Sequence, residues 1–237
     1  MSSVINWIQE KGYDFYRAFI EKDRYLAYLD GFRITLLVSL FAVIIGVLIG
    51  FVLAIIKYTT ADRKGWRFLN KLANFYITII RGTPVYVQLL IIYYIIFTSR
   101  DASPMLAGII CFGINSSAYV AEIIRAGIEA VDRGQVEAGR SLGLGEFQTM
   151  ASIILPQAVK NILPALGNEF IVLIKETSIV GLIAVRDVTK AAQNVSGITY
   201  DFLTPLIIAA IMYLLAVIIL TKLLSMLERR LKKSDRR

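Results

Sequence analysis

The sequence predicts an all-α integral membrane protein with five membrane-spanning helices and one short cytoplasmic helix. The chain has 237 residues, of which 57% are hydrophobic and 19% charged, and its mean hydropathy is +0.64. A soluble domain normally carries about a quarter charged residues. Several apolar runs reach the roughly 20 residues that a helix needs to cross a bilayer. Backbone groups in lipid must be hydrogen-bonded within their own segment, so we expect these runs to be helices.

Five segments are candidates for membrane spans, with bounds accurate to a few residues. In order, they are residues 34–56, 72–98, 105–124, 166–185 and 202–224. The first contains Gly46 and Gly50, a spacing typical of a close-packing helix face. The second is interrupted by Arg81-Gly82-Thr83-Pro84, and the fourth is the least apolar.

The distribution of basic residues predicts the orientation. Lys and Arg are frequent in the loop 57–71, in the segment 125–160 and in the tail 228–237, whereas the remaining loops carry few. The positive-inside rule therefore places these three regions in the cytoplasm and the N-terminus outside. The basic residues among the first 33 argue the other way, but acidic residues, which weigh little in the rule, accompany them. We expect an extracytoplasmic segment 1–30, a transmembrane domain 31–227 with a cytoplasmic loop at about 135–160, and a basic cytoplasmic tail 228–237.

Composition excludes several functions. The chain has no His and one Cys, Cys111, so we expect no disulfide within the chain, no zinc site and no thiol–imidazole catalysis. No phosphate-binding Gly-x-x-x-x-Gly-Lys-Ser/Thr loop and no Gly-x-Ser-x-Gly elbow occurs. The net charge is +8, and the basic residues flank the predicted membrane spans. This position favours contact with anionic lipid head groups over binding of nucleic acid. The first 30 residues lack the pattern of a secretory signal, so the first span is expected to be an uncleaved anchor. We expect no enzyme activity, metal or cofactor in this chain, and any energy must come from a partner.

One polar, patterned stretch interrupts the apolar chain: EAGRSLGLGEFQTMASIILPQAV, residues 137–159. Gly143 and Gly145 favour a tight turn, and Pro156 is expected to end the pattern. Between them, one helix face is apolar: it comprises Phe147, Met150, Ala151 and Ile154. Such a helix is equally suited to a groove on another protein or to the bilayer surface.

The same stretch carries a family signature. Glu137-Ala138-Gly139, three residues, Gly143, nine residues and Ile153-Ile154-Leu155-Pro156 resemble the EAA signature of permease subunits of bacterial ABC importers. That signature reads Glu-Ala-Ala, three residues, Gly, nine residues, Ile-x-Leu-Pro, and Gly139 is the one departure. Other segments resemble the polar amino acid uptake branch of this family: residues 30–36, 81–84 with Gln88, 118–123, 167–170 and 175–178.

The resemblance implies the type I ABC importer permease fold, in which the stretch forms a coupling helix on a cytoplasmic ABC ATPase dimer that binds ATP and Mg. It also implies a second permease subunit, identical or closely similar, an extracytoplasmic amino-acid-binding protein, and a place in the bacterial inner membrane. The residues expected to couple to the ATPase are Glu137, Ala138, Gly139, Gly143, Leu144, Gly145, Phe147 and Pro156. The alternative functions are an accessory membrane protein and a secondary transporter, although a secondary transporter would usually show repeated halves.

Polar residues within the spans are candidates for a substrate site, because charges inside a membrane normally face the bundle interior or a water-filled cavity. Counted at about 1.5 Å per residue, Arg81, Glu122 and Glu169 could meet at similar depth. They form either a structural or gating ion pair, or opposite charges for the two ends of an amino acid zwitterion. A helix that restarts after Pro84 would favour an anion. The candidate set is Arg81, Thr83, Asn115, Ser117, Glu122, Asn168 and Glu169; ordinary packing between helices explains the neutral members equally well.

Overall fold

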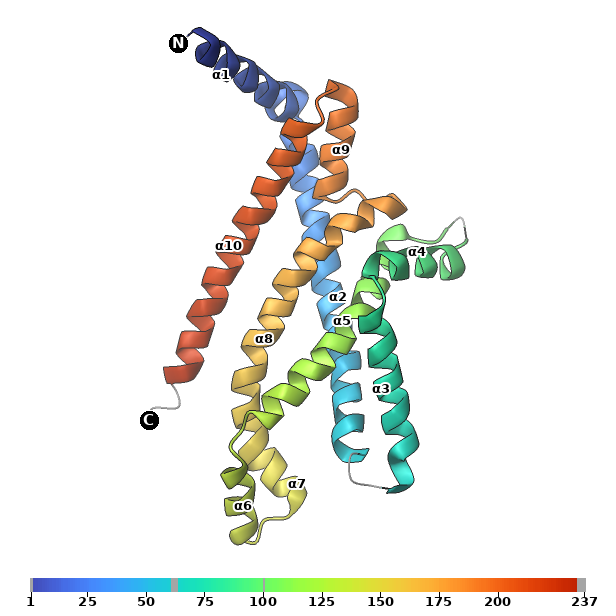
Figure 1. The fold of residues 1–237 in the computed structure, drawn as a ribbon, viewed down its shortest axis with the longest axis vertical. Coiled ribbons are helices and arrows are strands. Elements are labelled where there is room, and N and C mark those ends of the chain that lie inside the picture. Colours follow the sequence, from blue (N-terminus) through green and yellow to red (C-terminus); the bar gives the residue numbers. More distant parts are fainter. Residues whose placement is uncertain (1, 61–63, 100, 234–237) are drawn as a thin grey trace.

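The computed structural model describes residues 2–60, 64–99 and 101–233, and within these residues all regular structure is helical. Among the described residues, three helices are long and apolar enough to cross a membrane: α2 (Tyr25–Thr60), α5 (Pro104–Glu129) and α10 (Leu203–Lys233). A fourth candidate is the bent pair α3 (Arg67–Gly82) and α4 (Val85–Ile96). The helices form an elongated bundle with α1 (Ser2–Phe15) at one end. Two short helices, α6 (Arg133–Ser141) and α7 (Glu146–Thr149), form the opposite end (Figure 1).

The first span begins earlier than expected, at Tyr25, so the boundary expected at residue 30 falls inside α2. Tertiary packing explains the extension, because Tyr28 is fully buried against a cluster that includes Ala18 and residues of α9 (Val188–Thr199) and α10. The helix therefore continues beyond its purely apolar part.

The expected second span, residues 72–98, is two helices that meet at an angle of 105°. Thr83 is extended, with φ −120° and ψ 144°, as expected for a residue before proline. Pro84 cannot donate a backbone hydrogen bond, so α3 ends at Gly82 and α4 starts afresh at Val85. Figure 1 shows α4 lying across the end of α3.

The expected fourth span corresponds to α8 (Leu155–Glu176) and the 3-10 helix η5 (Thr177–Ile183). Neither is among the described helices that are long and apolar enough to span a membrane alone. The part of the chain that the structure describes contains three such helices, or four spans with the bent pair, so the count of five remains a prediction.

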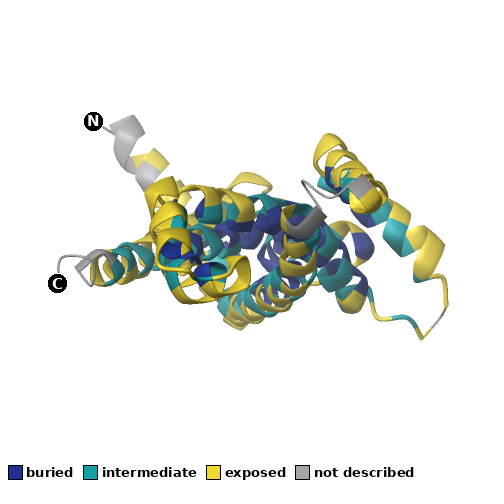
Figure 2. Cartoon of the chain, turned by 90° about the horizontal axis from the view of Figure 1, so that it is seen from below, coloured by how far each residue is buried: buried dark blue, intermediate teal, exposed yellow. Residues whose placement is uncertain are grey.

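The core lies where α2 and α5 cross, and Figure 2 shows the buried residues gathered inside the bundle. A Cβ on Gly46 would lie 2.8 Å from Ser116 Oγ, and one on Gly50 would lie 2.7 Å from the Val120 Cβ. Both glycines therefore permit a helix contact that alanine would push apart, which confirms the expected close-packing face. Cys111 is buried in the same core.

The α1 end is closed by α9, which is tied to α10 through one buried carboxylate. Asp187 accepts backbone hydrogen bonds from Thr189 and Lys190 and a side-chain hydrogen bond from the Tyr213 hydroxyl at 3.1 Å. Burial raises the pKa of the Asp187 carboxyl, and these hydrogen bonds oppose that rise. The arrangement caps α9 and fixes its start against α10.

Candidate functional site

The patterned stretch forms a compact projection that we call the α6–α7 segment, residues 133–154. It comprises α6 (Arg133–Ser141), α7 (Glu146–Thr149) and a π-helical turn, η4 (Met150–Ile154). Asp132 caps α6 by accepting a hydrogen bond from the Gly134 amide. The segment protrudes at the end of the bundle that lies opposite α1 (Figure 1).

Gly143 makes the turn between α6 and α7 with a φ of +79°, a backbone conformation that favours glycine. Its amide donates to the Arg140 carbonyl, and the Leu144 amide donates to the Gly139 carbonyl. These bonds satisfy the last carbonyls of α6, in the manner of a glycine helix cap. The predicted tight turn is confirmed at Gly143.

The expected apolar face divides between the bundle and the surface. Ile154 is buried and Met150 packs against the same core cluster, whereas the Phe147 side chain is 83% exposed. Leu142, which the periodicity did not identify, is 78% exposed at the same turn. An exposed Phe and Leu beside a rigid turn are suited to insertion into an apolar groove.

Gly139, the one departure from the EAA signature, is explained by packing. A Cβ at this position would lie 2.7 Å from the Thr149 Cγ2 and 2.9 Å from its Oγ1. Thr149, the last residue of α7, is itself buried. Alanine at position 139 would therefore require α6 and the Thr149 side chain to move apart.

Pro156 does not end the helix, and the expectation that it would was wrong. The chain stays helical from Glu146 to Glu176 through η4, and Pro156 lies in the first turn of α8. In the π-helical turn the Leu155 amide donates to the Met150 carbonyl. This wider turn directly before the proline is where the helix accommodates a residue without an amide hydrogen.

The residues expected to couple to an ATPase lie on this segment, except Pro156, which is in the first turn of α8. Leu144 is partly exposed and Gly139 is buried. The exposed members are Glu137, Ala138, Gly143, Gly145, Phe147 and Pro156.

The break between α3 and α4 is held by Gln88, whose role sequence reasoning did not identify. Its side-chain amide donates to the Ile80 carbonyl at 2.8 Å, to the Thr83 carbonyl at 3.1 Å and to the Thr83 hydroxyl at 2.7 Å. Its Oε1 accepts from the Asn115 amide at 3.0 Å. Two candidate residues, Thr83 and Asn115, are thus joined through one amide that also satisfies carbonyls released at the break.

The three candidate charges have separate partners. The Arg81 guanidinium lies 5.1 Å from the centre of the Tyr119 ring, a cation–π distance, and the side chain is exposed. Within the described part of the chain, no ion pair of Arg81 is found. Glu169 is 8% exposed and accepts a hydrogen bond from the Ser116 hydroxyl at 2.7 Å.

Glu122 lies in a charged cluster nearer the α6–α7 end. Its carboxylate is 2.7 Å from Lys57 Nζ and 2.8 Å from the Arg125 guanidinium, which also contacts Glu129 at 2.7 Å. Glu122 is therefore neutralised by cations other than Arg81, and the meeting of all three charges is not observed.

Two further candidates have ordinary surroundings. The Ser117 hydroxyl lies 2.7 Å from the Tyr76 hydroxyl and donates to the Ile114 carbonyl, which joins α3 to α5. Asn168 is exposed next to Glu169 on α8.

Comparison with known proteins agrees with these features. The family described as binding-protein-dependent transport system inner membrane component matches residues 46–233. A relative named putative glutamine transport system permease protein GlnP, of Rickettsia typhi, is 44% identical over 86% of this chain and 92% of its own length. The arginine transport system permease protein ArtQ of Bacillus subtilis is 41% identical over 87% of this chain and 93% of its own length.

Solved structures show the same fold. A crystal structure described as an amino acid ABC transporter with histidines has a TM-score of 0.81 and 45% identity, covering 87% of this chain and 94% of that chain. The MetNI methionine ABC transporter in an inward-facing conformation has a TM-score of 0.76 at 17% identity, which supports the fold alone. With most of its length matched, this chain belongs to the family of binding-protein-dependent transport system inner membrane components, the ABC transporter permeases.

Proposed function

We propose that this chain is the membrane-spanning subunit that forms the translocation path for polar or charged L-amino acids in an ATP-driven importer. The observation that carries the proposal is the α6–α7 segment, which projects from a membrane-spanning bundle and carries the exposed Phe147 on α7. Relatives named for glutamine and arginine transport support the substrate class.

Coupling follows from the shape of this projection. Gly143 fixes the turn, and the exposed Phe147 and Leu142 offer apolar groups to a groove on a cytoplasmic ATPase dimer, which would bind ATP and Mg. In the proposed orientation, the α6–α7 segment and the C-terminus are in the cytoplasm and the N-terminus is outside. An extracytoplasmic binding protein would deliver the amino acid at the α1–α9 end, and a second permease subunit would complete the path.

The substrate site lies around the α3–α4 break in this proposal. Arg81, which lacks an ion pair in the described structure, would bind the α-carboxylate with help from the Thr83 region. Glu169 would bind the α-ammonium, since its carboxylate has a single described hydrogen-bond donor, Ser116. The neutral residues Asn115, Ser117 and Asn168 would supply hydrogen bonds nearby.

Glu122 fits this site less directly. Because Lys57 and Arg125 already neutralise its carboxylate, we assign it an electrostatic role at the α6–α7 end of the path rather than a contact with the ammonium group.

Reconstitution in proteoliposomes tests the function. The chain, its ATPase and its binding protein should transport radiolabelled glutamine or arginine across the membrane only when ATP is supplied on the side where the ATPase lies. Uptake driven by an ion gradient without ATP would identify a secondary transporter. Unchanged ATP-driven uptake after omission of this chain would identify an accessory protein.

A further inference from the structure

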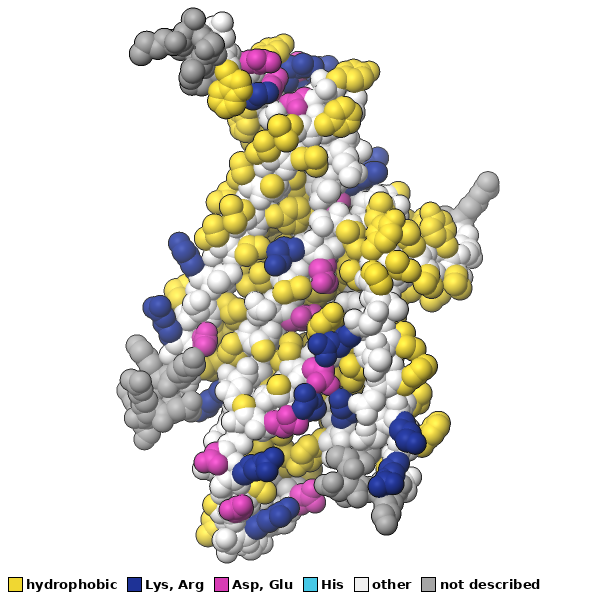
Figure 3. Space-filling model, in the orientation of Figure 1, with side chains coloured by type: hydrophobic (Ala, Val, Ile, Leu, Met, Phe, Trp, Pro, Cys, Tyr) yellow, Lys and Arg dark blue, Asp and Glu magenta, His cyan; other side chains and the backbone are white. Residues whose placement is uncertain are grey.

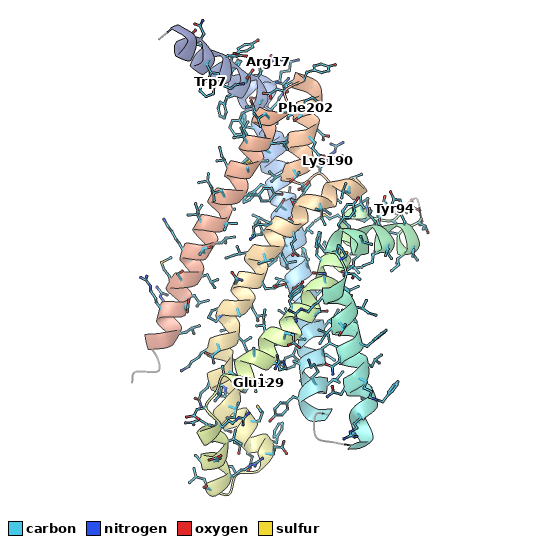
Figure 4. All side chains as sticks on the ribbon, viewed as in Figure 1. Trp7, Arg17, Tyr94, Glu129, Lys190 and Phe202 are labelled. Carbon is cyan, nitrogen blue, oxygen red and sulfur yellow. The ribbon has the colours of Figure 1, made fainter. Side chains whose placement is uncertain are left out.

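A cavity of about 430 Å³ lies between the α6–α7 segment and the adjoining ends of α2, α3 and α5. Its volume is within the range of small-molecule sites. The charged and polar side chains of its lining are Lys57, Tyr58, Asn70, Arg125, Glu129, Arg140 and Glu146. Figure 3 shows charged side chains of both signs over this part of the molecule, and Figure 4 labels Glu129 there.

Most of these charges already neutralise one another. Glu122, which is not part of the lining, lies 2.7 Å from Lys57 and 2.8 Å from Arg125, and Arg125 lies 2.7 Å from Glu129. This set forms a charge-balanced wall contributed by α2 and α5.

Two charges of the lining remain. Within the described residues, neither Arg140 nor Glu146 takes part in an ion pair, and both side chains are exposed. Arg140 belongs to α6 and Glu146 to α7, so they flank the Gly143 turn, and both line the cavity together with the wall. The cavity therefore offers one cation, one anion, and neutral hydrogen-bonding groups from Tyr58 and Asn70.

We propose that this cavity binds a free α-amino acid from the cytoplasm, with its α-carboxylate at Arg140 and its α-ammonium at Glu146. The orientation toward the cytoplasm rests on the proposed function. A guanidinium binds a carboxylate through two parallel hydrogen bonds, and a carboxylate is the matching acceptor for an ammonium group. A phosphate is a poorer match because it has no positive group to pair with Glu146, which lines the same cavity.

Binding here would regulate coupling. A ligand held by Arg140 and Glu146 against the wall of Lys57 and Arg125 bridges the α6–α7 segment to the transmembrane helices. A ligand that binds one arrangement of two elements more tightly than another shifts the population toward that arrangement. Amino acid that accumulates inside the cell then holds the segment in place and slows ATP turnover.

The test uses the full chain in two measurements. The first is equilibrium binding of radiolabelled glutamine and arginine to the detergent-solubilised chain alone, for the native protein, Arg140→Gln and Glu146→Gln. The second is ATP turnover of the reconstituted complex with the same amino acids added on the ATPase side. Arg133→Gln is the matched control, because Arg133 is exposed on the same helix and does not line the cavity.

Both cavity variants should weaken amino acid binding to the solubilised chain, and raise the half-inhibitory concentration on the ATPase side, by about tenfold or more. Arg133→Gln should leave both unchanged. Glutamine amide, which lacks the α-carboxylate, should fail to inhibit the native complex. Equal inhibition of all variants would overturn the proposal, as would inhibition by inorganic phosphate at the same concentration. Slow turnover of Arg140→Gln without amino acid, with an unchanged half-inhibitory concentration, would assign these charges to the ATPase interface instead. Because the binding measurement needs no ATPase, it still decides the proposal if ATP-driven uptake fails.

Discussion

Substitution of Gly143 should weaken the docking of a partner on the α6–α7 segment in proportion to the backbone strain that it introduces. The φ of this residue is +79°, and apart from its chain neighbours no atom of the described structure lies within 4 Å of the position that a Cβ would occupy. Clash with the rest of this chain is therefore excluded as the cause of an effect, and within the chain the left-handed backbone conformation distinguishes the substituents.

The size of the effect follows from that conformation. An L-residue other than glycine pays about 1–2 kcal/mol in the left-handed region, asparagine pays less, and a β-branched residue pays more. One or two kcal/mol reduces the fraction of segments in the docking conformation by about 5–30-fold. The dissociation constant of the ATPase should rise by that factor for Gly143→Ala, by more for Gly143→Val, and by less for Gly143→Asn.

The assay is equilibrium binding of fluorescently labelled ATPase to the permease in nanodiscs. Gly134→Ala is the matched control, since Gly134 lies on α6 outside the residues expected to couple, has no positive φ, and its nearest neighbour, Asp132 Oδ1, would be 3.5 Å from a Cβ. Thermal melting of the bundle should not change, because the turn is exposed. If Gly143→Asn proved as damaging as Gly143→Val, or if Gly143→Val had no effect, the turn conformation would be irrelevant to docking.

Three further predictions concern the bundle. Arg81→Gln and Glu169→Gln should weaken amino acid binding by about 2–5 kcal/mol with little change in melting temperature; unchanged affinity with a large fall in melting temperature would identify structural residues. Gln88→Leu should destabilise the bundle by about 1–3 kcal/mol, because the carbonyls of Ile80 and Thr83 at the α3–α4 break lose their donor and the buried Gln88 site loses its hydrogen bonds; an unchanged melting temperature would contradict this. In a Cys111→Ala background, an impermeant thiol reagent applied to intact cells should label a cysteine that replaces Ser103 but none in the tail beyond residue 227; the reverse pattern would invert the orientation.

The sequence was sufficient to predict the class of the fold, the break at Arg81–Pro84 and the projecting segment. Each depends on local chemistry: apolar runs of spanning length, a proline without an amide hydrogen, and a glycine at a turn. The 105° bend at the break was not predictable, because it depends on Gln88 reaching back to Ile80 and across to Asn115.

The partner of Glu122 was unpredictable for the same reason. Lys57 is 65 residues away in the sequence, and only the packing of α2 on α5 brings the two side chains together. Counting residues along helices estimated depth but not direction around the helix axis, so it grouped Glu122 with Arg81 although Glu122 pairs with Lys57 and Arg125.

The geometry also constrains how the α6–α7 segment can act on the proposed substrate site. The chain is helical without interruption from Glu146 to Glu176, so Phe147 and Glu169 are carried by one continuous element. At about 1.5 Å per residue, a rigid helix would transmit a displacement of the segment over more than about 30 Å. Helices bend where the hydrogen-bond ladder is disturbed, and this one has two such places, the π-helical turn η4 and Pro164. Both lie between the projecting tip and Glu169, so the motion that reaches Glu169 depends on the stiffness of these two places rather than on the tip alone.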